Sequence, residues 1–161
     1  MPRQRGCAII LWHNSMEKVI LPNEVLIGEV VQLLSEGREV VMTPKGISML
    51  PFIRGEVDRV KLQRPDKLKV GDIVLAHFGG IYVIHRIIAI KEDNVVLMGD
   101  GNLHTEQGKR SDVLGMVTEI IKPNNRRHKP GSAWLWRHIL PLRPYLLKVY
   151  RKWNKWIGKP I

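Results

Sequence analysis

Cysteine and long apolar runs are scarce in this 161-residue chain, and acidic residues are missing from its C-terminal part. Cys7 is the only cysteine, which excludes an internal disulfide and a cysteine-based zinc site. The apolar run Cys7–Trp12 is far shorter than the roughly 18–20 residues of a spanning helix, and no small-residue cleavage site follows it. We therefore expect no transmembrane segment and no cleaved signal peptide, and a protein that is cytoplasmic or peripheral at a membrane.

The absence of acidic residues begins at Lys122, and the chain carries eleven Lys and Arg residues from there to its end. Residues 1–121 hold the other 15 basic residues and all 15 acidic ones, so the net charge of +11 belongs to the last forty residues. A segregated basic tail is typical of proteins with an anionic partner. Composition thus predicts a domain over 1–121, a linker over 122–132 and a basic aromatic tail over 133–161.

The pattern of apolar residues predicts a mainly β body with one N-terminal helix. Apolar residues from Val25 to Leu34 have helical spacing, and Gly37 closes that segment. Short β-type runs bounded by turn residues predict further strands, and Gly79-Gly80 predicts a hairpin. These strands are expected at 18–21, 40–42, 57–62, 73–78, 81–90, 95–98 and 113–121. The expected fold is a small curled sheet or partly open barrel.

The first candidate for chemistry is Ser48, in the segment 46–51 that reads Gly-Ile-Ser-Met-Leu-Pro. A nucleophilic serine needs an exposed hydroxyl, a base within hydrogen-bond reach and donors for the oxyanion. Gly46 permits close approach by a substrate, and Pro51 stiffens the following turn. Taken alone, however, a serine between Gly and Pro is more often a turn residue than a nucleophile.

Three further motifs follow the serine motif in order: Gly-Asp-Ile-Val at 71–74, Ile-His-Arg at 84–86 and Gly-Asp-Gly-Asn at 99–102. Together they resemble the ordered motifs of the S24/S26 peptidases, which include signal peptidases and LexA-like self-cleaving repressors. Bacterial members carry a lysine base where this chain has His85, so the chain resembles the histidine type of the endoplasmic reticulum and archaea. The resemblance implies that fold and a serine endopeptidase, with Ser48 as nucleophile and His85 as base.

A histidine base is usually oriented by a carboxylate, and the sequence offers several. Asp100 matches the family's Gly-Asp-Asn-Asn element, and Glu106 falls by spacing on the downstream position where the eukaryotic branch has its aspartate. We give Asp100 a slight lead over Glu106, with Asp112 as a weaker third candidate. A dyad of Ser48 and His85 without a fixed carboxylate is the remaining alternative.

The resemblance implies an extended leader or signal-type peptide, or a precursor protein, as the substrate, held by strand addition. We expect residues 44–47 and 82–84 to flank this peptide on either side and to pair with it through their main chains. We expect the peptide to contact Ile47, Met49, Tyr82, Val83 and Ile84. Signal peptidases prefer small residues beside the scissile bond, so the resemblance implies that Met49, Phe52 and Ile84 wall a shallow pocket. A place for these three residues in the hydrophobic core is an equally weighted alternative.

The histidines predict no metal site, because His77, His85 and His104 fall in different segments without ligand spacing. We expect no metal and no cofactor. Two other functions compete with the peptidase: a catalytically inactive peptide-binding module of the same fold, and a repressor-type regulator. The regulator is the weakest, because the residues before Ser48 contain no convincing helix-turn-helix.

The tail predicts an amphipathic helix that begins near Pro144 and ends before Gly158. Its apolar residues trace one stripe, and its Lys and Arg residues fall largely off that stripe. The stripe comprises Tyr145, Leu146, Val149, Tyr150, Trp153, Trp156 and Ile157. This pattern favours an anionic membrane surface as partner of residues 133–157. The alternatives are a helix that docks its Trp face on the body and a nucleic-acid arm, and we expect no nucleic acid.

Overall fold

A computed structural model describes residues 9–11, 19–21, 23–139 and 142–156 of the chain. Its main element is an eight-stranded antiparallel sheet. The strands, in their order across the sheet, are β3 (Val40–Met42), β4 (Arg59–Gln63), β9 (Val113–Ile121), β5 (Ile73–Phe78), β6 (Ile81–Lys91), β7 (Asn94–Met98) and β8 (Thr105–Lys109), with β10 (Arg127–His128) beside β9. The expectation of a mainly β protein is confirmed, and the strands at 73–78 and 113–121 have the predicted bounds.

Helices lie at both ends of the described chain, as expected. They are α1 (Asn23–Ser35), the short α2 (Trp134–His138) and α3 (Arg143–Trp156), and a 3-10 turn covers Arg110–Asp112. A separate two-stranded sheet pairs β1 (Ile9–Leu11) with β2 (Val19–Leu21). In the part of the chain that the structure describes, no helix is both long and apolar enough to cross a membrane.

Strand β5 separates two hydrophobic cores, because alternate side chains of a strand point to opposite faces of its sheet. Ile73 and Leu75 belong to a first core, which α1, β3, β4, β9 and the loop after β3 complete. Val74, Ala76 and Phe78 belong to a second core with side chains of β6, β7 and β9. Both faces of β5 are therefore buried except at the exposed His77, and the strand lies between the two cores.

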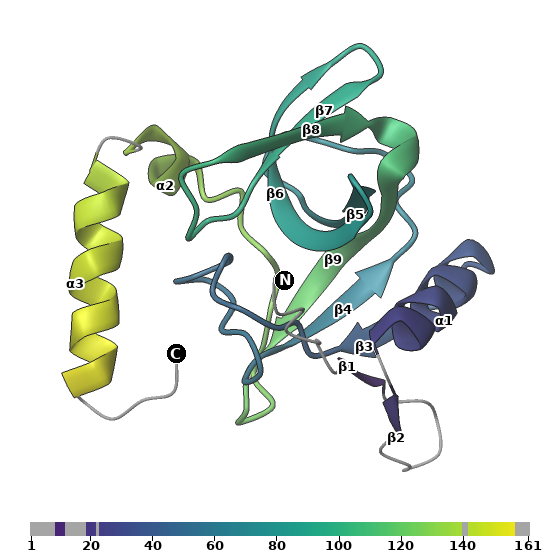
Figure 1. The fold of residues 1–161 in the computed structure, drawn as a ribbon, viewed down its shortest axis with the longest axis horizontal. Coiled ribbons are helices and arrows are strands. Elements are labelled where there is room, and N and C mark those ends of the chain that lie inside the picture. Colours follow the sequence, from purple (N-terminus) through teal and green to yellow (C-terminus); the bar gives the residue numbers. More distant parts are fainter. Residues whose placement is uncertain (1–8, 12–18, 22, 140–141, 157–161) are drawn as a thin grey trace, which may run out of the picture.

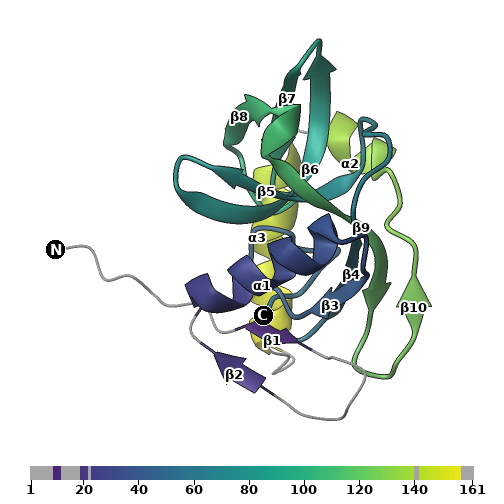
Figure 2. The ribbon, with the colours of Figure 1, turned by 90° about the vertical axis from the view of Figure 1, so that its right-hand side faces the viewer.

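The sheet curls, and β8 passes over the strands β5 and β6 in the view of Figure 1. Gly108 of β8 lies against the ring of Phe78 at the end of β5. A Cβ atom at Gly108 of β8 would lie 2.0 Å from Phe78 Cε1, so glycine is required at this approach. Among the described strands, β8 forms a ladder with β7 alone, and the sheet is therefore not closed. α1 covers the side of the sheet near β3, whereas α3 stands beside the sheet and is joined to it through α2 (Figures 1 and 2).

Three described strands escaped the sequence prediction: β1, β8 and β10. β8 matters most, because it carries Glu106. Its sequence, Thr-Glu-Gln-Gly-Lys, is polar and contains only one strong β-former. Its side chains alternate between exposed and half-buried, as expected for a strand at the edge of a sheet.

Candidate active site

Ser48 lies in the loop between β3 and β4. Backbone contacts join the two ends of this loop, and its apolar side chains pack into the core. The Glu56 N–H donates to the Pro44 carbonyl at 2.7 Å, and the backbones of Gly46 and Gly55 approach so closely that a Cβ at Gly55 would overlap Gly46. Three apolar residues of the loop are buried: Met49, Leu50 and Ile53. The loop is thus anchored by packing, while Ser48 itself stays half-buried.

The Ser48 loop rests on the turn that follows β7. The Gly101 N–H donates to the Ser48 carbonyl at 2.7 Å, and a Cβ at Gly99 would lie 2.4 Å from that oxygen. Arg86 of β6 pairs with Met98 of β7, so the backbone at Gly99 comes next to the position of His85. The loop and the histidine strand therefore meet at the end of β7.

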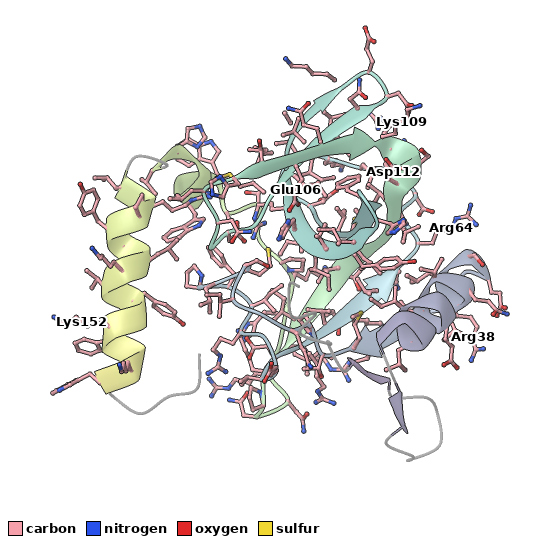
Figure 3. The ribbon with its side chains drawn as sticks, viewed as in Figure 1. Arg38, Arg64, Glu106, Lys109, Asp112 and Lys152 are labelled. Carbon is pink, nitrogen blue, oxygen red and sulfur yellow. The ribbon has the colours of Figure 1, made fainter. Side chains whose placement is uncertain are left out.

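His85 is buried in β6, opposite Val74 of β5, and contacts one carboxylate. Its Nδ1 lies 2.5 Å from Oε2 of Glu106, whose side chain remains 32% exposed. The contact follows from register: Glu106 pairs with Leu97 and Leu97 pairs with Ile87, so their side chains lie on the same face as that of His85. Figure 3 shows Glu106 beside β8, between this strand and the curl of β6.

Asp100, the other leading carboxylate, faces Arg86 instead. Arg86 donates to it through Nε at 2.9 and 3.1 Å and through Nη2 at 2.7 Å, and both side chains are 1% exposed. The Nη1 of Arg86 donates to the carbonyls of Gly71 at 2.7 Å and Gly131 at 2.6 Å. Asp100 is thereby committed to a buried ion pair that joins the sheet to the segment before α2.

Asp112, the third candidate, lies at the other end of β8 from the candidate site (Figure 3). Its Oδ2 accepts a hydrogen bond from the Lys109 N–H at 2.7 Å, within its own turn. Of the three carboxylates, Glu106 is therefore the one in contact with His85. Among the described residues no hydrogen bond joins Ser48 Oγ to His85.

The expected peptide-contacting residues divide into two groups. Ile47 and Tyr82 are 43% and 38% exposed, and Val83 and Ile84 are half-buried. Met49 is 5% exposed and belongs to the first core. The expectation that it contacts the peptide or walls a pocket is therefore wrong, and its side chain anchors the Ser48 loop in the core. Phe52 is half-buried between the guanidinium of Arg86, 5.4 Å from its ring centroid, and the edge of Trp136.

Contacts from the C-terminal tail to this region were missed by sequence reasoning. Trp136 Nε1 donates to the Asp100 carbonyl at 2.9 Å, and the buried Arg143 donates to Met98 Sδ at 3.5 Å and to the Trp136 carbonyl at 3.2 Å. Burial lowers the pKa of Arg143 and the charge of Arg86 adds to this, whereas Asp100 opposes it. An arginine at the first turn of a basic helix looks solvated in sequence, so no local signal could have found this contact.

The described residues contain no cluster of three or more His, Cys, Asp or Glu side chains able to hold a metal ion. What the arrangement offers is general-base chemistry. Since Nδ1 of His85 is engaged by Glu106, Nε2 is the ring nitrogen available to take a proton. A comparison with protein-family models finds no match for this chain, and a comparison with curated proteins finds none either.

Proposed function

We propose that this chain is a serine endopeptidase of the signal-peptidase type that cleaves an extended leader or signal-type peptide. The observation that carries the proposal is the 2.5 Å contact between Nδ1 of the buried His85 and Glu106. The Ser48 loop packs nearby, against the turn that joins β7 to the strand of Glu106. A histidine with one nitrogen held by a carboxylate is the arrangement that orients a catalytic base. The open antiparallel sheet agrees with the fold that this activity implies.

In the proposed reaction, Ser48 Oγ attacks the scissile carbonyl while His85 Nε2 accepts the hydroxyl proton. Glu106 holds the ring orientation and stabilises the imidazolium that forms. The imidazolium then gives its proton to the leaving amine, which leaves an acyl group on Ser48. A water molecule, deprotonated by His85, hydrolyses this ester and restores the enzyme.

The tetrahedral intermediates need hydrogen-bond donors for their oxyanion. The Ser48 N–H is a candidate, since it donates no hydrogen bond to another described residue. The Ser48 carbonyl is held by the Gly101 N–H, which fixes the orientation of the peptide units around the nucleophile. The donor would therefore be positioned before the substrate binds.

The substrate is proposed to bind as an added strand between the Ser48 loop and the start of β6. Ile47 on one side and Tyr82 on the other are exposed at these two segments. Main-chain hydrogen bonds would supply affinity, and side chains at alternate positions would supply selectivity. Tyr82 is also fixed in place, because its ring stacks on His77 with centroids 4.4 Å apart.

A second candidate is a peptide-binding module of the same fold that does not cut. The missing hydrogen bond between Ser48 and His85 in the described residues favours it. Such bonds are often long in enzymes without substrate and tighten only in the complex. The buried His85 and its single carboxylate contact therefore support the peptidase more strongly than this feature supports the binding module.

The test is covalent labelling of Ser48 with a serine-directed acylating probe, combined with turnover of a library of extended peptides. We expect the wild type to be labelled, Ser48→Ala to be unlabelled, and His85→Ala to be labelled at least about 10³-fold more slowly. Ser111→Ala is the matched control, because Ser111 is exposed in the turn after β8. Equal labelling of Ser48→Ala and wild type would overturn the assignment. Peptide binding without labelling or turnover would favour the binding module.

A further inference from the structure

Helix α3 has three distinct faces, which follow from the rotation of about 100° per residue in an α-helix. Arg143 and Leu147 share the first face, and among the α3 side chains that the structure describes these two are buried, at 1% and 4% exposed. The apolar stripe is centred about 110° away from them, and the lysines occupy the remaining third. The helix is therefore held by a face other than the one its hydrophobic pattern predicts.

The body-facing side of α3 is small and specific. Arg143 reaches Met98 and the Trp136 carbonyl, and its guanidinium lies 5.5 Å from the centroid of the Trp136 ring. Leu147 follows one turn later, and it is the residue that falls off the apolar stripe. These contacts fix the orientation of the helix without using its tryptophans.

Most of the stripe is exposed, and among its described members only Tyr150 is half-buried. Four of its side chains are Tyr145, Val149, Trp153 and Trp156, which are 72%, 65%, 59% and 80% exposed. The Trp153 and Trp156 rings lie 6.0 Å apart and so form one continuous apolar surface. The expected alternative, a helix that docks its Trp face on the body, is thus excluded for these residues; Ile157 lies outside the described residues.

The adjoining face is basic. Lys148, Lys152 and Lys155 are exposed on α3, and Figure 3 shows Lys152 pointing away from the sheet. No acidic residue follows Lys122, so no side chain of the tail neutralises them. An aromatic face beside a row of lysines is suited to the boundary between lipid headgroups and acyl chains, where indole rings are enriched.

We propose that the aromatic stripe and the lysine row of α3 bind the surface of a bilayer that contains anionic lipids. Charge complementarity selects this occupant, because a second copy of the chain would bring one lysine row against another. The surface involves none of the proposed catalytic residues, so the proposal goes beyond the peptidase activity and does not depend on it. A membrane would then be contacted by α3 while α2 and Arg143 hold the body beside it.

The proposal is tested by co-sedimentation of the full chain with phosphatidylcholine vesicles, with and without phosphatidylglycerol. We expect the wild type to bind vesicles that contain phosphatidylglycerol, more weakly as salt rises, and to leave pure phosphatidylcholine vesicles largely unbound. The double variant Trp153→Ala, Trp156→Ala should reduce the partition coefficient by at least about tenfold, because two interfacial anchors are lost.

Charge reversal on α3 gives a second, matched pair of variants. Lys148→Glu, Lys152→Glu, Lys155→Glu should lower binding by about a hundredfold or more, since each basic residue near an anionic leaflet contributes substantially. The control is Lys67→Glu, Lys69→Glu, Lys91→Glu, which changes the net charge equally on exposed positions of the body. It should retain most of the binding.

Several results would overturn the proposal. These are equal binding of both vesicle types by the wild type, equal loss from the body and α3 charge variants, or unchanged binding by the double Trp variant. A concentration-dependent dimer that the Trp substitutions abolish would assign the stripe to a second copy, and tighter binding to RNA than to vesicles would assign the lysines to nucleic acid. Circular dichroism must show that each variant folds, which the exposure of all five α3 positions favours.

Discussion

Two neighbouring residues of β6, His85 and Arg86, point to opposite faces of the sheet, and each contacts a carboxylate from the β7–β8 segment. Arg86 and Asp100 are both 1% exposed and share three hydrogen bonds. His85 touches Glu106 through one nitrogen, and the glutamate remains 32% exposed. His85 and Arg86 are adjacent in sequence, but their two ion pairs differ in burial and in the number of hydrogen bonds.

The difference separates a structural ion pair from a candidate catalytic one. A buried guanidinium whose three nitrogens all donate to protein acceptors holds elements together, and at 1% exposure it is not accessible to a substrate. His85 keeps Nε2 available, because its contact with Glu106 uses only Nδ1. Burial and the number of bonds made, more than residue type, therefore indicate which carboxylate is suited to chemistry.

The largest expected effect comes from breaking the structural pair. Asp100→Asn should lower the free energy of unfolding by about 3–5 kcal/mol, because it leaves the Arg86 charge buried without its counter-ion. Urea denaturation of the full chain measures this. Asp112→Asn is the control, because its carboxylate bonds only within an exposed turn, and it should cost much less. Equal costs for the two variants would show that the Arg86–Asp100 pair stabilises the fold no more than a carboxylate in an exposed turn does.

The reciprocal change tests the candidate catalytic pair. Glu106→Gln should slow Ser48 acylation and peptide turnover by roughly 10²–10⁴-fold, because the amide no longer stabilises the imidazolium. The free energy of unfolding should change by no more than about 1 kcal/mol, since the glutamate is partly solvated. Glu119→Gln, a carboxylate paired with the exposed Arg127, should leave the rate unchanged. Full activity in Glu106→Gln would favour a dyad or another carboxylate.

A third carboxylate, Asp58, offers a smaller effect with a defined pH dependence. Burial would raise the pKa of Asp58, but hydrogen bonds from Arg54 and Lys122 outweigh it and hold the pKa below the usual 3.8. A lowered carboxylate pKa stabilises the fold above 3.8, and this contribution is lost as the pH falls through the lower folded-state value.

Asp58→Asn should therefore cost about 1–3 kcal/mol at neutral pH and flatten the loss of stability below about pH 4. The cost is expected to be smaller than that of Asp100→Asn, because Arg54 and Lys122 are partly exposed and can be rehydrated. Urea denaturation at a series of acidic pH values measures both. An unchanged acid slope in Asp58→Asn would show that other carboxyl groups control the acid sensitivity.

Much of the fold was predictable because its signals are local. The apolar runs of β5 and β9, the glycine pair between β5 and β6, and the helical spacing of α1 each lie within a few residues. β8 was missed because an edge strand needs few β-formers when it is held by its neighbour β7. The slight preference for Asp100 over Glu106 rested on motif position, whereas the choice depends on strand register and on which face each side chain occupies.

By itself, the sequence determined the candidate nucleophile and base, the mainly β class and the existence of a basic aromatic helix, since residue order and periodicity are local properties. Tertiary structure decided that Glu106 contacts His85, that Asp100 contacts Arg86, and that Leu147 of α3 is buried while the tryptophans of that helix are exposed. The physical reason is the same in all three cases. A side chain's environment is set by strand register and by packing between segments far apart in the chain, and neither is encoded in the spacing of one segment.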